Sequence, residues 1–339
     1  MRKKVIFLLT LLTGFVFFLS CSKEKDLNLN NDSSIAPESR LKAGAGGIKG
    51  VNWADARDNY QSGWVLPSGI NAGDSYSTIK SHAQTICFEF INKLGANTVR
   101  IPINPPTVSQ WWNNYKGVID GALAQGMKVI IACWTESGSI GYVTDWNAFK
   151  SMWTTVVNAY AGNSSVYFEI LNEPYSYSKN DLLNMYSAWL GDHSNAPRGR
   201  VLCGGTGYSD NVNNIGGDSR ISGCLYSQHI YPWWGSGNLS YWYNNLLGRI
   251  GSSNYSKTVV TEFGCVQNSG LNFYGTSSSD NNVCFFQGVA NSCRDKGISC
   301  CYWPGLRDGD SFSMTTRNSN YKLNIVNSSG VNELKWAYH

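Results

Sequence analysis

Charge and histidine are scarce in this 339-residue sequence. Asp, Glu, Lys and Arg together make up 15% of it, and it contains four histidines. The net charge is +4, and the basic residues are scattered rather than grouped into the stripe typical of nucleic-acid-binding proteins. No two histidines have HxxxH spacing, and no cysteine lies in a CxxC or Cys/His array of the zinc type. We therefore expect neither a nucleic-acid partner nor a bound metal.

Long apolar runs are missing except at the N-terminus. Residues 5–19 form an apolar segment that follows three basic residues and ends in Phe18-Leu19-Ser20-Cys21. The run has the length of a secretory signal and is short for a membrane span. Its ending resembles a bacterial lipobox, in which the cysteine becomes the acylated first residue. We predict a lipoprotein-type signal peptide over 1–21 with Cys21 as the lipidation site; an ordinary signal peptide is the alternative.

The following segment, residues 22–46, lacks any hydrophobic period. It is polar and charged and then rich in glycine and alanine, which is typical of a flexible tether. No further linker occurs, so we expect one folded domain over 47–339. The expected protein is an exported monomer, anchored by lipid to a bacterial outer membrane or cell surface, or else secreted or periplasmic. Ten cysteines less Cys21 leave an odd number, so at least one has no partner within the chain.

Within this domain, apolar strand-like runs alternate with helical patterns. The strand candidates are 48–53, 98–103, 128–134, 166–172, 201–204, 224–231, 258–263 and 299–303. Between the first two, apolar residues from Ile79 to Leu94 recur at steps of three or four, the spacing of a helix with one buried face. Gly95 follows as a residue suited to end that helix. Further helices are expected at 118–124, 146–160, 179–190, 239–250 and 283–296, whereas a long polar loop follows Gly204.

This alternation predicts an α/β fold. Near-continuous apolar strands that alternate with helices are typical of a parallel sheet covered on both faces. The first strand is not followed by a GxGxxG turn, which argues against a dinucleotide fold and its cofactor. Eight strands in one domain favour a closed (β/α)8 TIM barrel over an open sheet.

Polar and aromatic residues stand at the expected carboxyl ends of these strands, where a TIM barrel places its active site. They are Arg100 on the second strand, Asn172 and Glu173 on the fourth, His229 and Tyr231 on the sixth, Glu262 on the seventh and Trp303 on the eighth. One glutamate at a strand end could be a solvated loop residue or part of a buried ion pair. Two glutamates three strands apart are harder to explain in that way.

A pair of carboxylates that face each other across a cleft suits the cleavage of a glycosidic bond. One must be protonated to donate to the leaving oxygen, and the other must be ionised to attack the anomeric carbon or activate water. We expect Arg100 and the Tyr231 hydroxyl to keep Glu262 ionised. Partial desolvation and the charge of Glu262 would raise the pKa of Glu173. His229 is interpreted as a hydrogen-bonding partner of the acid/base rather than a metal ligand.

The segment Tyr167-Phe168-Glu169-Ile170-Leu171-Asn172-Glu173-Pro174 resembles the acid/base strand of glycoside hydrolase family 5, the cellulase-like family. The resemblance extends, in the family's order, to 99–102, 229–231, 260–264 and 302–303. It implies a retaining hydrolase that needs no cofactor and acts by double displacement on a β-linked polysaccharide or oligosaccharide. β-Glucan and hemicellulose are both compatible substrates.

The resemblance also implies roles for the residues around the two glutamates. Asn172 would bind the 2-hydroxyl of the sugar whose bond is cleaved, and Trp303 would form the platform of that subsite. The remaining three residues would support the two carboxylates; they are Arg100, His229 and Tyr231. Retention of configuration would need the carboxyl groups of Glu173 and Glu262 roughly 5–5.5 Å apart.

One position departs from the family's pattern. Family members usually end the third strand with a histidine that contacts the same sugar, and here Trp134 stands in that place. An indole offers stacking and one donor, whereas an imidazole offers a compact polar contact. The identity of the sugar is therefore open, and so is whether Trp134 contacts substrate or fills the core.

Two charged loops should meet at the rim of the cleft, because the first and last strands of a closed barrel are neighbours. They are 55–59, which contains Arg57, and 307–310, which begins with Arg307. One interpretation is an Arg/Asp lattice that holds the loops together. The other is that Arg57 or Arg307 recognises substrate hydroxyls or a uronate.

Aromatic residues are abundant, with 13 tryptophans and 19 tyrosines. Trp and Tyr fill cores, and they also stack on sugar rings. The pairs Trp111-Trp112 and Trp233-Trp234 are candidates for sugar platforms in outer subsites, with packing as the alternative. Two other functions also stay open: a transglycosylase with the same site, and a surface glycan-binding barrel that has lost catalysis.

Overall fold

The computed structural model describes residues 47–136, 138–139 and 141–338. The expected signal peptide, its Cys21 and the expected tether lie outside the described residues. Within the described ranges, no helix combines the length and the apolar character needed to cross a membrane.

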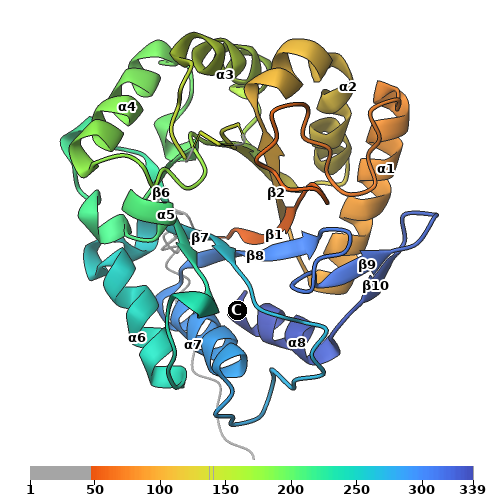
Figure 1. Cartoon of the computed structure of the whole chain (residues 1–339), viewed down its shortest axis with the longest axis vertical. Coiled ribbons are helices and arrows are strands. Elements are labelled where there is room, and N and C mark those ends of the chain that lie inside the picture. The colour runs from red at the N-terminus through yellow and green to blue at the C-terminus, as the bar shows by residue number, and fades with distance from the viewer. Residues whose placement is uncertain (1–46, 137, 140, 339) are drawn as a thin grey trace, which may run out of the picture. The chain divides into compact units, whose positions relative to one another are not determined.

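Eight parallel strands form a closed barrel at the centre of the domain. Each strand pairs with the next along the chain, and β1 also pairs with β8, so the sheet closes on itself (Figure 1). The strands are β1 (Lys49–Trp53), β2 (Thr98–Ile103), β3 (Lys128–Cys133), β4 (Val166–Glu169), β5 (Val201–Gly204), β6 (Leu225–Ile230), β7 (Thr258–Phe263) and β8 (Ser299–Leu306). The predicted (β/α)8 TIM barrel is confirmed.

Helices surround this barrel, and most begin with an N-terminal capping side chain. The polar residue before the first turn accepts a hydrogen bond from a backbone N–H of that turn, which satisfies a donor that the helix leaves unpaired. The helices capped in this way are α1 (Tyr76–Glu89), α2 (Pro105–Ala124), α3 (Trp146–Tyr160), α4 (Lys179–Asp192), α6 (Leu239–Ile250), α7 (Asn281–Lys296) and α8 (Ser328–Ala337). A π-helical turn, Phe90–Leu94, extends α1 and ends at Gly95 in a left-handed conformation.

The interior of the barrel has an apolar layer with polar residues above it. The apolar layer lies near the strand starts and consists of Ile48, Ile130, Leu202, Leu225, Val259 and Cys301. Arg100 is the register partner of Ile130 on the neighbouring strand, so its side chain projects into the same interior. Apolar packing therefore closes one end of the barrel, and polar groups occupy the interior toward the other end.

The segment after β5 is irregular, as the sequence predicted. It contains the four-residue α5 (Thr206–Ser209) and 3-10 turns at Val212–Asn214 and Ser219–Ile221 instead of a long helix. Three elements near the C-terminus were not predicted: the antiparallel strands β9 (Thr315–Arg317) and β10 (Leu323–Ile325), and α8.

Candidate active site

Glu262 and His229 lie opposite each other on neighbouring strands. They are register partners on β7 and β6, one residue before each strand ends. Glu173 comes from the loop after β4, where its backbone has φ of +43°, in the left-handed region that a glutamate rarely adopts. The loop after β3 approaches this turn closely, because a Cβ at Gly141 would lie 2.2 Å from the Glu173 carbonyl oxygen. The structure thus brings the two predicted catalytic glutamates to the same end of the barrel.

Arg100 is the fully buried cation of this site. Its Nη1 donates to Glu262 Oε1, and its Nη2 donates to Asn172 Oδ1 at 2.8 Å. Its Nε and Nη2 also form a bidentate pair with Glu169, at 2.5 and 2.9 Å. A bidentate pair fixes the plane of the guanidinium. Glu169 is a fully buried carboxylate that the sequence did not single out, and it orients the cation that contacts Glu262.

The carboxyl group of Glu262 is buried, and the Tyr231 hydroxyl donates to its Oε2 at 2.7 Å. Burial raises its pKa above the usual range, while the charges of His229 and Arg100 and the Tyr231 hydrogen bond act against that rise. Arg100 and Tyr231 thus favour the ionised form of Glu262, in the expected direction, and burial is an opposing contribution that the sequence did not reveal.

His229 connects the two carboxylates. Its Nδ1 lies 3.1 Å from Glu173 Oε1 and 3.6 Å from Glu262 Oε2, and its Nε2 lies 3.1 Å from Thr261 Oγ1. Burial lowers the pKa of His229, but the charge of Glu262 and hydrogen bonds to Glu169 and Glu173 outweigh it and raise the pKa to about 9. Both ring nitrogens therefore carry protons at neutral pH, and Nδ1–H donates to Glu173.

Tyr60, in the loop after β1, completes the surroundings of Glu173. Its hydroxyl donates to Glu173 Oε2 at 3.1 Å and accepts from Asn172 Nδ2 at 2.8 Å. The two oxygens of Glu173 thus have separate partners, since Oε1 accepts from His229. Asn172 is held between Arg100 and Tyr60 through its two amide atoms.

The three titratable groups at the centre are close together. One carboxylate oxygen of Glu173, one of Glu262 and a ring nitrogen of His229 all lie within 4.8 Å of one another, a spacing that could hold a metal ion. A metal would need a lone pair on the His229 nitrogen. With the pKa of His229 raised to about 9, that nitrogen carries a proton at neutral pH, which a metal ion would have to displace.

Trp134 and Trp303 lie beside this network. The two indoles stack with centroids 6.2 Å apart, and the Arg100 guanidinium lies 4.5 Å from the centroid of the Trp134 ring. Trp134 is 2% exposed, whereas Trp303 is partly exposed. Trp134 packs against Arg100 and also lines a pocket, while Trp303 exposes more of its surface.

The charged loops after β1 and β8 lie side by side, as barrel closure requires. Arg307 Nε donates to the backbone oxygen of Asp55 at 3.0 Å, and its Nη1 pairs with Asp310 at 3.0 Å. Arg57 forms a bidentate pair with Asp55, at 3.0 and 2.7 Å. Both guanidinium groups thus take part in the predicted lattice, and neither contacts Glu173 or Glu262 in the hydrogen bonds and ion pairs of the described residues.

The two tryptophan pairs have different environments. Trp111 belongs to the core and stacks on Trp64 with centroids 5.1 Å apart, and Trp112 packs against Tyr115. Trp233 is 61% exposed and stacks on Tyr231 at 4.2 Å, while Trp234 is partly buried. Packing therefore accounts for Trp111 and Trp112, and Trp233 has the exposure that a sugar platform needs.

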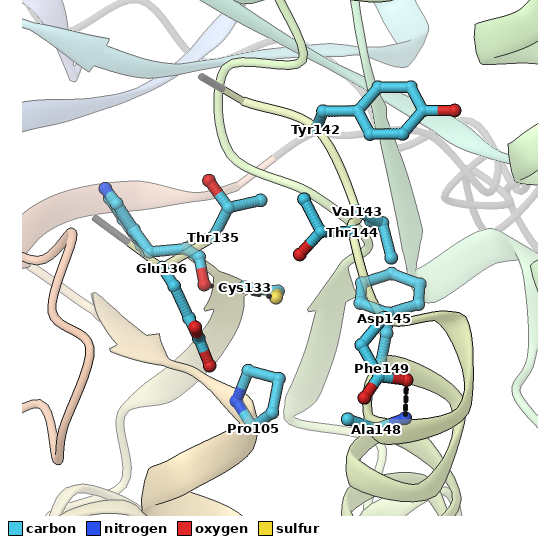
Figure 2. Close-up of a pocket in the computed structure, with 11 residues that line it drawn as sticks. Pro105, Cys133, Thr135, Glu136, Tyr142, Val143, Thr144, Asp145, Ala148 and Phe149 are labelled. Atoms are coloured by element: carbon cyan, nitrogen blue, oxygen red, sulfur yellow. Dashed lines mark hydrogen bonds between the residues drawn. The ribbon is translucent and has the colours of Figure 1, made fainter. Parts of the chain in front are cut away.

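Two pockets open near the ends of β3 and β4. One, of about 250 Å³, is lined by Tyr60, Glu136, Glu173 and the stacked rings of Tyr175 and Tyr208. Figure 2 shows the other, of about 160 Å³, with Thr135 and Glu136 on one side and Val143 and Phe149 on the opposite side. Glu136 borders both pockets. The acid/base candidate Glu173 thus faces a space lined by aromatic rings.

Comparisons with known proteins agree with this architecture. A family model described as cellulase, glycosyl hydrolase family 5, matches residues 64–305. An endoglucanase structure aligns with a TM-score of 0.61 at 16% identity, over 85% of this chain and 96% of that chain. The endocellulase of Pyrococcus horikoshii, in complex with cellotetraose, aligns at 0.62 and 16% identity over 86% and 92%. Thermotoga maritima Cel5A, in complex with mannotriose, aligns at 0.59 and 15% identity over 74% and 89%. No curated protein sequence matches the chain.

Proposed function

This chain belongs to glycosyl hydrolase family 5, the cellulase family, and we propose that it is a retaining glycosidase with Glu173 as acid/base and Glu262 as nucleophile. The observation that carries the proposal is the close approach of the two carboxylates, since one oxygen of Glu173 lies within 4.8 Å of one oxygen of Glu262. This approach supports the short separation of carboxyl groups in retaining enzymes, roughly 5–5.5 Å, over the roughly 6.5–9.5 Å that admits a water molecule in inverting enzymes.

In the first step, an ionised Glu262 oxygen attacks the anomeric carbon while Glu173 protonates the leaving glycosidic oxygen. The glycosidic C–O bond breaks, and an ester bond forms between the sugar and Glu262. Arg100 and Tyr231 each hold one oxygen of Glu262, which favours its charged form against the effect of burial. These contacts also fix the direction in which the carboxylate points.

In the second step, water replaces the leaving group. Glu173, now a carboxylate, removes a proton from the water molecule, whose oxygen attacks the anomeric carbon and displaces Glu262. His229 supports both steps because its Nδ1–H donates to Glu173 Oε1 at 3.1 Å. That hydrogen bond fixes the direction in which the Glu173 carboxyl group points in both steps.

A β-linked glucan is the proposed substrate. The support is the family itself, whose description is cellulase, together with neighbours of the same fold that are an endoglucanase and an endocellulase solved with cellotetraose. The Thermotoga maritima neighbour was solved with mannotriose, which makes mannan the second substrate to test. Trp134 packs against Arg100 where family members usually have a histidine, so the sugar preference of that subsite needs direct measurement.

The test is a reducing-sugar assay over a panel of β-glucans and mannans, followed by variants. Glu262→Ala and Glu173→Ala should each lower kcat on the best substrate by about 10³-fold or more. Asp192→Ala on the outer face of α4 is the matched control and should leave activity unchanged. Early products analysed by NMR should keep the configuration of the substrate. Inverted products, or a Glu262→Ala variant with normal turnover, would contradict the mechanism.

A further inference from the structure

A third pocket lies among the helices on the outer wall of the barrel. It has a volume of about 430 Å³ and lies between α6, α7, α8 and the loop that precedes α7. The residues of interest in its lining are Tyr274, Gln287, Asn291, Glu333 and Trp336. It shares no lining residue with the pockets near Glu173.

Glu333 contributes a buried carboxyl group to this pocket. The residue is 4% exposed, and among the described residues no hydrogen bond or ion pair reaches its side chain. Burial raises its pKa to about 7. Its oxygens are not among the fully enclosed polar atoms of the described residues, so they reach the open space of the pocket that Glu333 lines. A ligand in the pocket can therefore donate hydrogen bonds to this carboxyl group in place of water.

Two aromatic rings flank the same pocket and are exposed to solvent. Tyr274 is 42% exposed and Trp336 is 38% exposed, with their centroids 6.4 Å apart. The indole of Trp336 is fixed in place, since its Nε1 donates to Asn291 Oδ1 at 2.9 Å. Exposed, oriented aromatic faces beside a polar group suit a ring that has one apolar face and hydroxyls on its edge.

The charges around the pocket narrow the class of ligand. The Arg294 guanidinium lies 3.8 Å from the centroid of the Trp336 ring and would repel a cationic ligand there. The carboxyl of Glu333 disfavours an anion. A neutral ligand rich in hydroxyl groups meets both conditions, and its hydroxyls can donate to the Glu333 carboxylate.

The loop that carries Tyr274 is held in position by α7. Gln287 Nε2 donates to the backbone oxygens of Phe273 and Thr276, at 2.9 and 2.8 Å. These bonds span the residue that presents the tyrosine ring. The pocket is therefore preformed, which reduces the entropy lost when a ligand binds.

We infer that this pocket is a non-catalytic binding site for a neutral sugar unit of the polysaccharide, with Trp336 and Tyr274 as stacking surfaces and Glu333 as the hydrogen-bonding group. The inference rests on the proposed function for the identity of the polysaccharide. A second attachment point keeps a long chain at high effective concentration near the cleft. Its benefit is therefore confined to polymers and is absent for a substrate that fills the catalytic cleft alone.

The experiment compares Trp336→Ala and Tyr274→Ala with the wild type in native gels cast with β-glucan or mannan. Phe88→Ala, which removes an exposed aromatic ring from α1, is the matched control. Both pocket variants should migrate faster than the wild type in the glycan gel, with binding weakened by about 3- to 10-fold. Their kcat/KM on a soluble aryl cellobioside should equal that of the wild type, and Phe88→Ala should match the wild type in both assays.

Glu333→Gln provides a second test in the same assays, because it keeps the shape of the side chain and weakens its hydrogen bonds to hydroxyls. If the wild type hydrolyses glucan while all pocket variants bind it as the wild type does, the pocket inference fails and the proposed function stands. If the wild type is retarded in the gel and the pocket variants are not, yet no glycan is hydrolysed, the proposed function fails and the pocket inference stands. Equal losses on the soluble and polymeric substrates would also overturn the inference.

Discussion

At the residue scale, the buried cation Arg100 divides its contacts unequally between two carboxylates. Glu169 receives a bidentate pair from it, and although burial raises the pKa of Glu169, the charge of Arg100 and the hydrogen bonds lower it to about 2. Glu262 receives a contact from Nη1 alone, and its pKa stays raised by burial. Glu169 is thus a permanent counter-ion, while Glu262 keeps the higher proton affinity and hence the greater nucleophilicity of its ionised form.

Tyr60→Phe tests the support of the acid/base at this scale. The change removes a hydrogen bond to Glu173 Oε2 and one from Asn172, and keeps the ring. Because hydrogen bonds to charged groups contribute about 1.5–3 kcal/mol, kcat/KM should fall by about tenfold or more. Tyr243→Phe, which removes a bond to Asp295 at the surface, should have normal kinetics. Normal kinetics of Tyr60→Phe would show that its hydroxyl does not position Glu173.

The residues of the site differ in how far the sequence could predict them. Glu173 and Glu262 could be found because each stands at the end of an apolar run, where a barrel exposes side chains to the cleft. Glu169 lies inside such a run, and only the packing shows that its side chain meets Arg100. Tyr60 lies in a loop whose path no periodicity determines. The pKa of Glu262 depends on its burial, which is a property of the folded chain.

At the scale of elements, the helix starts are decided by single polar side chains. Asp280 is an example, since its Oδ1 accepts from the backbone N–H groups of Asn282 and Val283, at 2.8 and 3.3 Å. The carboxylate also lies at the positive end of the dipole of α7. Since α7 carries Gln287 and packs on β8, the cap helps to hold both the barrel wall and the pocket on it.

Asp280→Ala should lower the free energy of unfolding by about 1 kcal/mol, because two backbone donors lose their acceptor. Asp295→Ala is the control on the same helix: it removes an exposed carboxylate near the C-terminus and should change stability by less than about 0.5 kcal/mol. Denaturant unfolding of both variants gives the comparison. Equal stabilities for the two would mean that the cap does not contribute.

The elements that the sequence missed are short or lack a repeating pattern. The eighth strand was predicted to stop at 303 and continues to Leu306, past Pro304, a residue that cannot donate a ladder hydrogen bond. Strands β9 and β10 have three residues each, too few for an alternation to be seen. Most helices with long apolar periods were predicted, because the spacing of their apolar residues reveals the buried face. Two exceptions are α2, which begins at Pro105 and was predicted only from 118, and α8, which was not predicted.

At the scale of the whole domain, closure of the barrel joins segments far apart in sequence. The pairing of β1 with β8 brings Asp55 within hydrogen-bonding distance of Arg307, as the strand count predicted. Closure also buries ionisable groups with shifted pKa values. Glu333 and His229, at about 7 and about 9, both bind protons more tightly in the folded state than their usual values of 4.5 and 6.5.

The sign of the resulting pH dependence follows from linkage. Where the folded state binds more protons than the unfolded state, stability falls as pH rises. Glu333 contributes this loss between pH 4.5 and about 7, and His229 contributes it between pH 6.5 and about 9. Glu169 has the opposite effect because its pKa is lowered to about 2. Its contribution to stability is lost as pH falls from 4.5 toward 2.

Glu333→Gln should therefore raise the free energy of unfolding at pH 8 by up to about 3 kcal/mol more than it does at pH 4. The reason is that the wild type forms a buried charge at pH 8 and the variant does not. Denaturant unfolding of wild type and variant at the two pH values measures the difference. Glu136→Gln, at an exposed glutamate, should show no such difference. An equal effect of Glu333→Gln at both pH values would mean that Glu333 titrates normally in the folded protein.

The left-handed backbone of Glu173 places stability and activity in conflict at one residue. Since a non-glycine residue in that region costs about 1–2 kcal/mol, Glu173→Gly should be more stable than Glu173→Ala by about 1 kcal/mol, although both lack the carboxyl group. Thermal unfolding of the two variants would measure the gain; equal midpoints would contradict it. Selection for stability alone would replace this glutamate, so the proposed acid/base is a residue whose backbone conformation the fold disfavours.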